Sequence, residues 1–215
     1  MARWEPNARE RLVEAALTLF QERGFDETAV ADIAARAGLT ERTFFRYFAD
    51  KREVLFGGSS ELEGLLVGGI AAAPSPLSPL DAVAHALEAA ASFFDGRRPF
   101  AKSRQAVIAA HPALQERELI KLASLATAMA GAMRQRGTPE PAASLAAEAG
   151  MAVFKLAFAR WTGDAHKRPL AQHLREALEQ LKAITTGLDR VGRARPRKTE
   201  RAARPRGDRS ASGTG

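Results

Sequence analysis

The feature that most constrains the fold is a three- to four-residue spacing of apolar side chains that recurs along most of the chain. Leu12, Ala16, Leu19 and Phe20 show it near the N-terminus. This spacing places side chains on one face of an α-helix, and no stretch shows the convincing alternation of a half-buried strand. Together with the abundance of alanine and leucine, the pattern predicts an all-α protein of about nine helices.

Glycines, prolines and capping residues divide this pattern into segments. We expect a first helix over about 7–23, ended by Gly24, then two short helices capped by Thr28 and Thr40. A fourth helix is expected over about 50–73, with Asp50 and Glu53 at capping-box spacing and weak points at Gly57-Gly58 and Gly68-Gly69. Five further helices are expected over about 79–95, 98–110, 112–136, 140–162 and 169–187. The clearest break is AAAPSPLSP, residues 71–79, which we interpret as a linker between two helical regions.

The net charge of +7 is unevenly distributed along the chain. Residues 188–215 hold nine basic and three acidic side chains, a balance of +6, which leaves only +1 for the rest. The composition of this Arg-rich segment predicts a disordered tail. A solubilising extension and a source of non-specific phosphate contacts are both open readings of it. Residues 1–51 hold eight basic and nine acidic side chains, so an argument for DNA binding there rests on geometry rather than charge.

Several classes of function lack the residues they need. The absence of cysteine excludes thiolate chemistry, disulfides and Cys-ligated metal sites, and it fits a reducing compartment. The four histidines form no HExxH or comparable pair, and we find no nucleophile elbow, Walker loop or GxGxxG. We therefore expect no catalytic residue, no metal and no cofactor. The start, MARWEPNARE, has no apolar core, and no run approaches about 18 uninterrupted apolar residues. A cytoplasmic protein without a membrane partner is expected.

Two short helices separated by AGLT, residues 37–40, have the form of a helix-turn-helix. At about 100° per residue, Phe44 and Phe48 define the buried face of the second helix. Arg42, Thr43 and Arg46 then point away from the core, and two aromatic side chains lie on the flanks. This distribution is typical of a recognition helix, although the turn alone also occurs in ordinary helical corners.

The helix-turn-helix geometry assigns a role to each outward side chain. Arg42 and Thr43 face base edges, the flanking aromatics press on sugar and phosphate, and basic or hydroxyl groups at helix starts meet phosphate oxygens. The threonines at 28 and 40 can equally be plain helix caps, and the arginines can be solvated surface charges. The predicted DNA contacts are Thr28, Thr40, Arg42, Thr43, Phe45, Arg46, Tyr47 and Lys51.

Residues 7–56 resemble the N-terminal DNA-binding region of TetR-type (TetR/AcrR) transcriptional regulators. The resemblance is carried by TAVADIAARAG, residues 28–38, and TERTFFRYFADK, residues 40–51. Two positions depart from the family pattern: Phe45 stands where a tyrosine is usual, and Arg42 where a small residue is usual. The first departure removes a hydroxyl that could bond phosphate, unless Tyr47 supplies one, and the second adds a side chain suited to guanine.

The resemblance implies three parts: a DNA-binding domain over 1–56, a helical ligand-binding and dimerisation domain over 57–187, and the tail over 188–215. It also implies a bacterial homodimer, most often a repressor, on a pseudo-palindromic DNA operator, with recognition helices about 34 Å apart. A small apolar or amphipathic effector would change that spacing through its differential affinity for two conformations, and the fourth helix is the expected lever.

The implied effector pocket has candidate lining residues that are mostly large and apolar. Side chains at this spacing are also what a plain core requires, so each one has both readings. The candidates are Phe93, Phe94, Phe100, Arg104, Ile108, His111, Met129, Met133, Met151, Phe154, Phe158 and Trp161.

The implied dimer interface is expected on the last two helices. One face carries Leu145, Ala149, Ala152, Val153, Leu156 and Ala159, and the other carries Leu170, Leu174, Leu178 and Leu181. Burial of these faces within one subunit is the alternative. Two other functions stay open at this point: a DNA-binding regulator that answers to no ligand, and a helical small-molecule enzyme with an incidental N-terminal motif.

Overall fold

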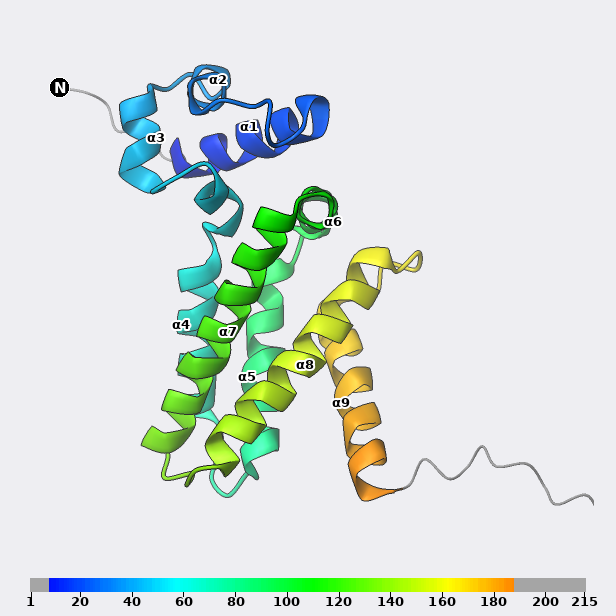
Figure 1. Cartoon of the computed structure of the whole chain (residues 1–215). Coiled ribbons are helices and arrows are strands. Elements are labelled where there is room, and N and C mark those ends of the chain that lie inside the picture. The colour runs from blue at the N-terminus through cyan, green and yellow to red at the C-terminus, as the bar shows by residue number, and fades with distance from the viewer. Residues whose placement is uncertain (1–7, 188–215) are drawn as a thin grey trace, which may run out of the picture.

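The structure, a computed structural model, describes residues 8–187, which form nine α-helices and two short 3-10 helices with no β-strand in that range (Figure 1). The all-α prediction is confirmed. The predicted start at Asn7 and the predicted tail over 188–215 lie outside the described residues. The elements are α1 Ala8–Arg23, α2 Val30–Arg36, α3 Glu41–Tyr47, η1 Arg52–Phe56, α4 Ser59–Ala72, α5 Pro79–Ala90, η2 Ala91–Phe94, α6 Arg98–Ala110, α7 Pro112–Gln135, α8 Ala142–Gly163 and α9 Leu170–Thr186.

Local capping chemistry accounts for several helix ends. Ser78 accepts a hydrogen bond from the Asp81 N–H at 3.2 Å, and Pro79 occupies the first turn of α5, where its missing N–H costs nothing. The end of α9 is closed by Gly187 at φ +71°, a left-handed conformation that glycine adopts without strain. The break predicted within 71–79 is confirmed, because α4 ends at Ala72 and α5 begins only at Pro79. Its interpretation as a linker between two helical regions is wrong, because α4 and α5 share the bundle core.

The predicted fourth helix is divided in the structure. Asp50 accepts from the backbone N–H groups of Arg52 and Glu53, at 2.8 and 3.1 Å, but the turn that follows is 3-10 rather than α. The break predicted at Gly57-Gly58 is confirmed, since α4 begins only at Ser59. The weak point predicted at Gly68-Gly69 is wrong, because both residues lie inside a continuous α4.

Figure 1 shows a small head of α1, α2 and α3 lying across one end of a bundle of longer helices. Each part has its own apolar core. The head core is built from α1, α2, α3 and η1, and it also includes Val107, Ile108 and Leu114 from the corner between α6 and α7. The bundle core is built from α4, α5, α7, α8 and α9. The head is therefore joined to the α6–α7 corner by a shared core as well as by the chain connection into α4.

Two stretches, 52–72 and 142–163, are long and apolar enough to cross a membrane when judged by length and composition alone. The first contributes residues 54–56 to the head core and Leu66 and Ile70 to the bundle core, and the second contributes Phe154 and Ala157 to the bundle core. Core helices of globular proteins commonly meet the same criterion.

Candidate nucleic-acid interface

The turn between α2 and α3 has the geometry of a helix-turn-helix. Gly38 lies at φ +67°, where an L side chain would be strained, and the Leu39 N–H donates to the Ala34 carbonyl at 2.8 Å. Thr40 then caps α3, because its hydroxyl accepts from the Thr43 N–H at 3.2 Å. The capping role predicted for Thr40 is confirmed, and the cap leaves this side chain exposed beside the outer face of α3.

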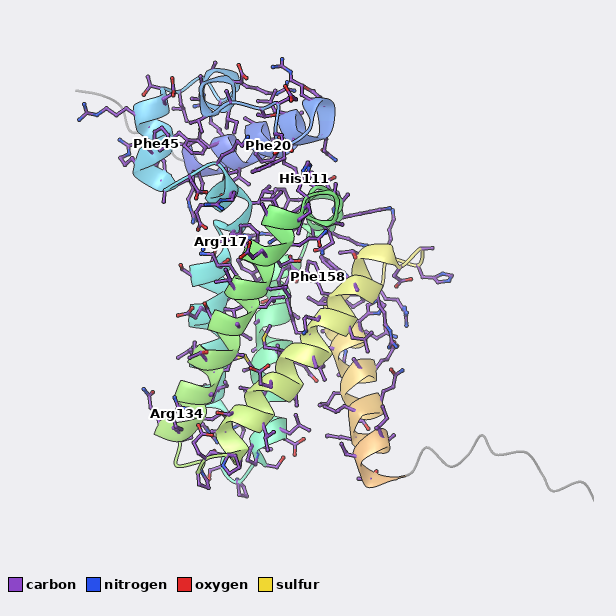
Figure 2. All side chains as sticks on the ribbon, in the orientation of Figure 1. Phe20, Phe45, His111, Arg117, Arg134 and Phe158 are labelled. Atoms are coloured by element: carbon purple, nitrogen blue, oxygen red, sulfur yellow. The ribbon has the colours of Figure 1, made fainter. Side chains whose placement is uncertain are left out.

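The two faces of α3 separate as its spacing predicts. Phe44 and Phe48 are buried in the head core, with ring centroids 5.4 Å apart. Arg42 and Arg46 are exposed, and the Phe45 side chain retains 54% of its accessible surface, an unusual fraction for a phenylalanine (Figure 2). The anchor is therefore rigid and aromatic, while the outer face presents two guanidinium groups and an uncovered ring.

One flank of α3 carries a stacked pair. The Arg46 guanidinium lies 5.0 Å from the centroid of the Tyr47 ring, and its Nη2 donates to the Tyr47 hydroxyl at 3.3 Å. The hydroxyl still has its own proton to donate. This arrangement holds a cation and a hydroxyl donor together at the edge of the recognition helix, as a phosphate contact requires.

Thr28 differs from its prediction. The residue that caps α2 is Ala29, whose N–H donates to the Asp32 carboxylate at 3.3 Å. Thr28 is 1% exposed, and its hydroxyl donates to the Gly24 carbonyl at 2.7 Å. The predicted cap is wrong because the hydroxyl closes the end of α1 instead. It points into the head rather than toward a phosphate.

Lys51 is engaged inside the head as well. Its ammonium donates to the carbonyls of Phe25 and Thr28, at 2.6 and 2.9 Å, and lies 4.3 Å from the centroid of the Phe25 ring. The lysine was expected to point at a phosphate from the start of the next helix. In the structure it ties η1 to the loop between α1 and α2, which gives it a positioning role.

The predicted pocket residues fall into three separate places. Phe93, Phe154, Phe158 and Trp161 form an aromatic cluster together with Phe94, which lies 5.4 Å from Phe158 and 5.9 Å from Trp161 by ring centroids. Buried in the bundle core are Met129, Met133 and Met151. The head junction holds Phe100, Arg104, Ile108 and His111.

A small cavity is present in the bundle. That cavity lies between α5, α8 and α9, is lined by Leu87, Val153, Leu174 and Leu178 among others, and has a volume of about 10 Å³, room for one water. None of the predicted pocket residues lines it. Within residues 8–187 no three His, Asp or Glu side chains gather as a metal site would require.

The junction between head and bundle holds charged residues whose pairing the sequence does not reveal. Glu53 was expected to complete a capping box with Asp50, yet its carboxylate pairs with Arg117 and Lys121 of α7. Arg104 was a pocket candidate, yet it donates to the Leu55 carbonyl at 2.7 Å and to Glu118 at 3.1 Å. Burial lowers the pKa of the Arg104 guanidinium, but an arginine remains charged at such a site.

An exposed apolar stripe runs along α8. Leu145 and Leu156 are 66% and 44% exposed, and Ala152 and Ala159 on the same side of the helix are exposed too, whereas Val153, also predicted for this face, is buried. The leucines of α9 behave differently: Leu170, Leu174 and Leu178 are buried in the bundle core and Leu181 packs against it, so the intrasubunit alternative holds for that helix. Ile184, which is 65% exposed, is the large apolar residue that α9 presents, and the predicted leucine spacing misses it.

Comparisons with known proteins agree with this geometry. Residues 12–56 match the family model described as "Bacterial regulatory proteins, tetR family", and residues 77–186 match the model described as "MftR C-terminal domain".

Two curated relatives match parts of the chain. The HTH-type transcriptional regulator TcmR of Streptomyces glaucescens is 35% identical over 81 residues, which cover 38% of this chain and 36% of TcmR. A relative named MftR in Mycobacterium tuberculosis is 34% identical over 102 residues, which cover 47% of this chain and 52% of that protein. The chain thus spans between a third and about half the length of these curated relatives.

A solved structure of similar fold is the transcriptional regulator FadR from Bacillus subtilis in complex with stearoyl-CoA. It aligns with a TM-score of 0.54 at 19% identity, covering 80% of this chain and 96% of that one.

Proposed function

The chain belongs to the TetR family of bacterial regulatory proteins, and we propose that it is a cytoplasmic DNA-binding repressor that leaves its operator when a small apolar or amphipathic effector binds. The observation that carries the proposal is the outer face of α3. A short helix capped by Thr40 and anchored by Phe44 presents Arg42, Thr43 and Arg46 away from the core. Such a helix enters the major groove.

The outward side chains divide between base reading and phosphate binding. Arg42, in the first turn of α3 and exposed, is suited to the O6 and N7 acceptors of guanine, a contact that discriminates between bases by about 1–3 kcal/mol. Arg46 and the Tyr47 hydroxyl are suited to phosphate at the groove edge. Because the head has no excess of basic residues, base and shape complementarity would carry more of the specificity than charge does.

The proposed homodimer forms through the apolar stripe of α8. Leu145, Leu156 and the neighbouring alanines are small or apolar, exposed, and aligned along one side of the helix. Ile184 adds an exposed apolar residue from α9. Burying a contiguous apolar patch of this kind against its symmetry mate is favourable, and a two-fold axis there would supply two heads for two half-sites of a pseudo-palindrome.

The proposed effector acts in the bundle. The aromatic cluster around Phe94 and Phe158 is only partly buried, and an apolar ligand could insert between its rings. The cavity between α5, α8 and α9, at about 10 Å³, is too small for such a ligand, and the effector-bound conformation in this proposal is a more open one, stabilised by the ligand's preference for it. The stearoyl-CoA complex of FadR is compatible with an amphipathic effector, although at 19% identity it supports only the fold.

A regulator that answers to no effector is the second candidate, and the small volume of the cavity between α5, α8 and α9 favours it. A thermal-shift screen with varied apolar compounds separates the two. An effector-responsive protein gives at least one saturable increase in melting temperature, which scales with ligand concentration. An enzyme is the less favoured reading, because the curated relatives are named transcriptional regulators.

The experiment that tests DNA recognition is a binding selection from random-sequence duplexes at near-physiological salt. Wild type is compared with Arg42→Ala and with Arg134→Ala, a matched charge removal. Arg134 pairs with Glu140 at 2.6 Å at the far end of α7 from the head (Figure 2). We expect wild type and Arg134→Ala to enrich one inverted repeat, and Arg42→Ala to lose or broaden the preference at one base of each half-site. Failure of wild type to enrich any sequence would refute the proposal.

A further inference from the structure

The turn that follows the recognition helix is attached to α7 by charge. Glu53 lies in η1, five residues beyond Phe48, and its carboxylate is held on both oxygens. Arg117 contacts Oε1, and the Lys121 ammonium lies 3.0 Å from Oε2. The Glu53 side chain is only 17% exposed, so this three-residue pairing is shielded more than a surface salt bridge. Figure 2 places Arg117 at the end of α7 nearest the head.

A second attachment runs through α6. The Arg104 Nε donates to the Leu55 carbonyl at 2.7 Å, and its Nη1 donates to Glu118 of α7 at 3.1 Å. The same guanidinium lies 4.9 Å from the centroid of the Phe56 ring. One half-buried cation therefore connects η1, α6 and α7. Removing it would leave a carbonyl and a carboxylate without their partner.

Apolar contacts also attach the head to the α6–α7 corner. Ile108 and Leu114 flank the α6–α7 corner and are buried in the head core. His111, at the corner itself, lies 5.5 Å from the Phe25 ring by centroids. The head is therefore fixed to the corner on two sides: by charge at η1 and by packing at the loop between α1 and α2.

The chain connection into α4 is a weaker mechanical link. The segment between η1 and α4 is Gly57-Gly58, where the 3-10 turn has ended and α4 begins only at Ser59. A continuous helix would transmit rotation along its axis, whereas a 3-10 turn followed by two glycines bends more easily. The earlier expectation that the fourth helix is the lever therefore fits the structure less well than a route through α6 and α7.

We propose that Glu53, Arg117 and Lys121 are positioning residues for operator recognition, holding each head against α7 so that the bundle sets the distance between the two recognition helices. The inference rests on the proposed function, since it requires a dimer that reads two half-sites. None of the three residues contacts DNA in this scheme. They act through η1, whose position fixes the anchor Phe48 and with it α3.

The test is the tolerance of the dimer for altered half-site spacing. The probe is the inverted repeat selected by wild type, together with versions that have one base pair inserted or removed at its centre. One base pair shifts a half-site by about 3.4 Å and turns it by about 35° around the duplex axis. A rigidly held pair of heads cannot follow this change. Wild type should therefore bind the altered duplexes at least tenfold more weakly, which corresponds to about 1.4 kcal/mol of binding free energy.

The informative variant is Glu53→Gln, which keeps the shape of the side chain and removes the charge that two cations share. We expect the affinity ratio between the selected repeat and the altered-spacing duplexes to fall about fivefold, the range that one partly shielded ion pair can supply. Arg117→Lys keeps the pairing and should retain the wild-type preference. Arg134→Ala, whose ion pair lies at the far end of α7, should retain it too.

The possible results distinguish failure of the positioning role from failure of the proposed function. Equal weakening of all three duplexes by Glu53→Gln, measured with a folded variant of unchanged melting temperature, would mean a purely structural role and would overturn the proposal. An unchanged spacing preference would overturn it as well. If wild type selects no inverted repeat, the proposed function itself fails, and that result is visible before any variant is made.

Discussion

Substituting alanine at either of two adjacent glycines in α4 should change the stability of the protein in opposite directions. A Cβ atom added at Gly69 would lie 2.8 Å from the Cα of Ala86 and 2.9 Å from its Cβ, whereas one added at Gly68 would meet nothing within 4 Å. Both positions lie in the interior of the same helix, where alanine is favoured over glycine by about 0.8–1 kcal/mol. Gly68→Ala should therefore raise the free energy of unfolding by up to about 1 kcal/mol.

Gly69→Ala gains the same helix propensity but must separate α4 from α5. The obstructing atoms belong to the backbone and Cβ of Ala86, which cannot rotate aside, so the cost should lie in the overpacking range of about 1–3 kcal/mol. The difference between the two variants cancels the propensity contribution and isolates the helix contact.

The assay is urea unfolding at one fixed protein concentration, because a dimer's stability depends on concentration. We expect a lower midpoint for Gly69→Ala and a higher one for Gly68→Ala, with similar slopes. A difference in unfolding free energy below about 0.5 kcal/mol would refute the close approach of α4 and α5.

Three further predictions concern the loop after α8, the dimer face and the recognition helix. Hydrogen bonds hold the pKa of the Asp164 carboxyl below its ordinary value of 3.8, above all the one from the His166 backbone N–H, with Arg168 and His173. The ionised carboxylate therefore stabilises the fold above that value, and this stabilisation is lost as the pH falls through the lower pKa of the folded state. Asp164→Asn should thus lower stability in chemical unfolding at pH 7, with a gap to wild type that shrinks below about pH 4; a gap independent of pH would contradict this. Leu156→Glu places a charge on the α8 stripe and should give monomers by sedimentation velocity without a lower helix content, whereas an intact dimer would exclude this face. Phe45→Tyr adds a hydroxyl to an exposed ring and should tighten operator binding by up to about tenfold, as one hydrogen bond to phosphate permits, and unchanged affinity in a titration would place the ring away from the DNA.

The fold was largely predictable because helix periodicity and turn chemistry are local. Gly24, Gly38 and Pro112 stand where helices end or begin in the structure, and the spacing of Phe44 and Phe48 identified the buried face of α3. The error at Gly68-Gly69 has a physical reason. A glycine can mark a break or a close helix crossing, and only the position of Ala86, a residue on another helix, decides which.

The candidate DNA interface was predictable where a side chain's role depends on its own helix. Thr40 caps α3 as its spacing indicates. Thr28 and Lys51 were misplaced because their partners are carbonyls of Gly24 and Phe25, at positions that a helical pattern does not specify. Hydroxyl and ammonium groups accept many roles, and the nearest unsatisfied carbonyl decides among them.

The bundle could be predicted least. Apolar residues at helical spacing line pockets and fill cores alike, so the candidates scattered over an aromatic cluster, a methionine core and the head junction. For α8 the exposed stripe favours a partner, whereas for α9 the same kind of pattern proved to be intrasubunit core. The pairing of Glu53 with Arg117, 64 residues away, has no signal in a single sequence.

The central claim is that the outer face of α3 reads base pairs, and the most direct measurement is a specificity ratio. Binding to the selected repeat and to a duplex with the contacted guanine replaced is titrated at several salt concentrations for wild type, Arg42→Ala and Arg46→Ala. Loss of the base contact in Arg42→Ala should lower the ratio about tenfold and leave the salt dependence nearly unchanged. Loss of the phosphate contact in Arg46→Ala should weaken both duplexes alike and reduce the logarithmic salt slope by about one. A specificity ratio that survives Arg42→Ala intact would contradict the account.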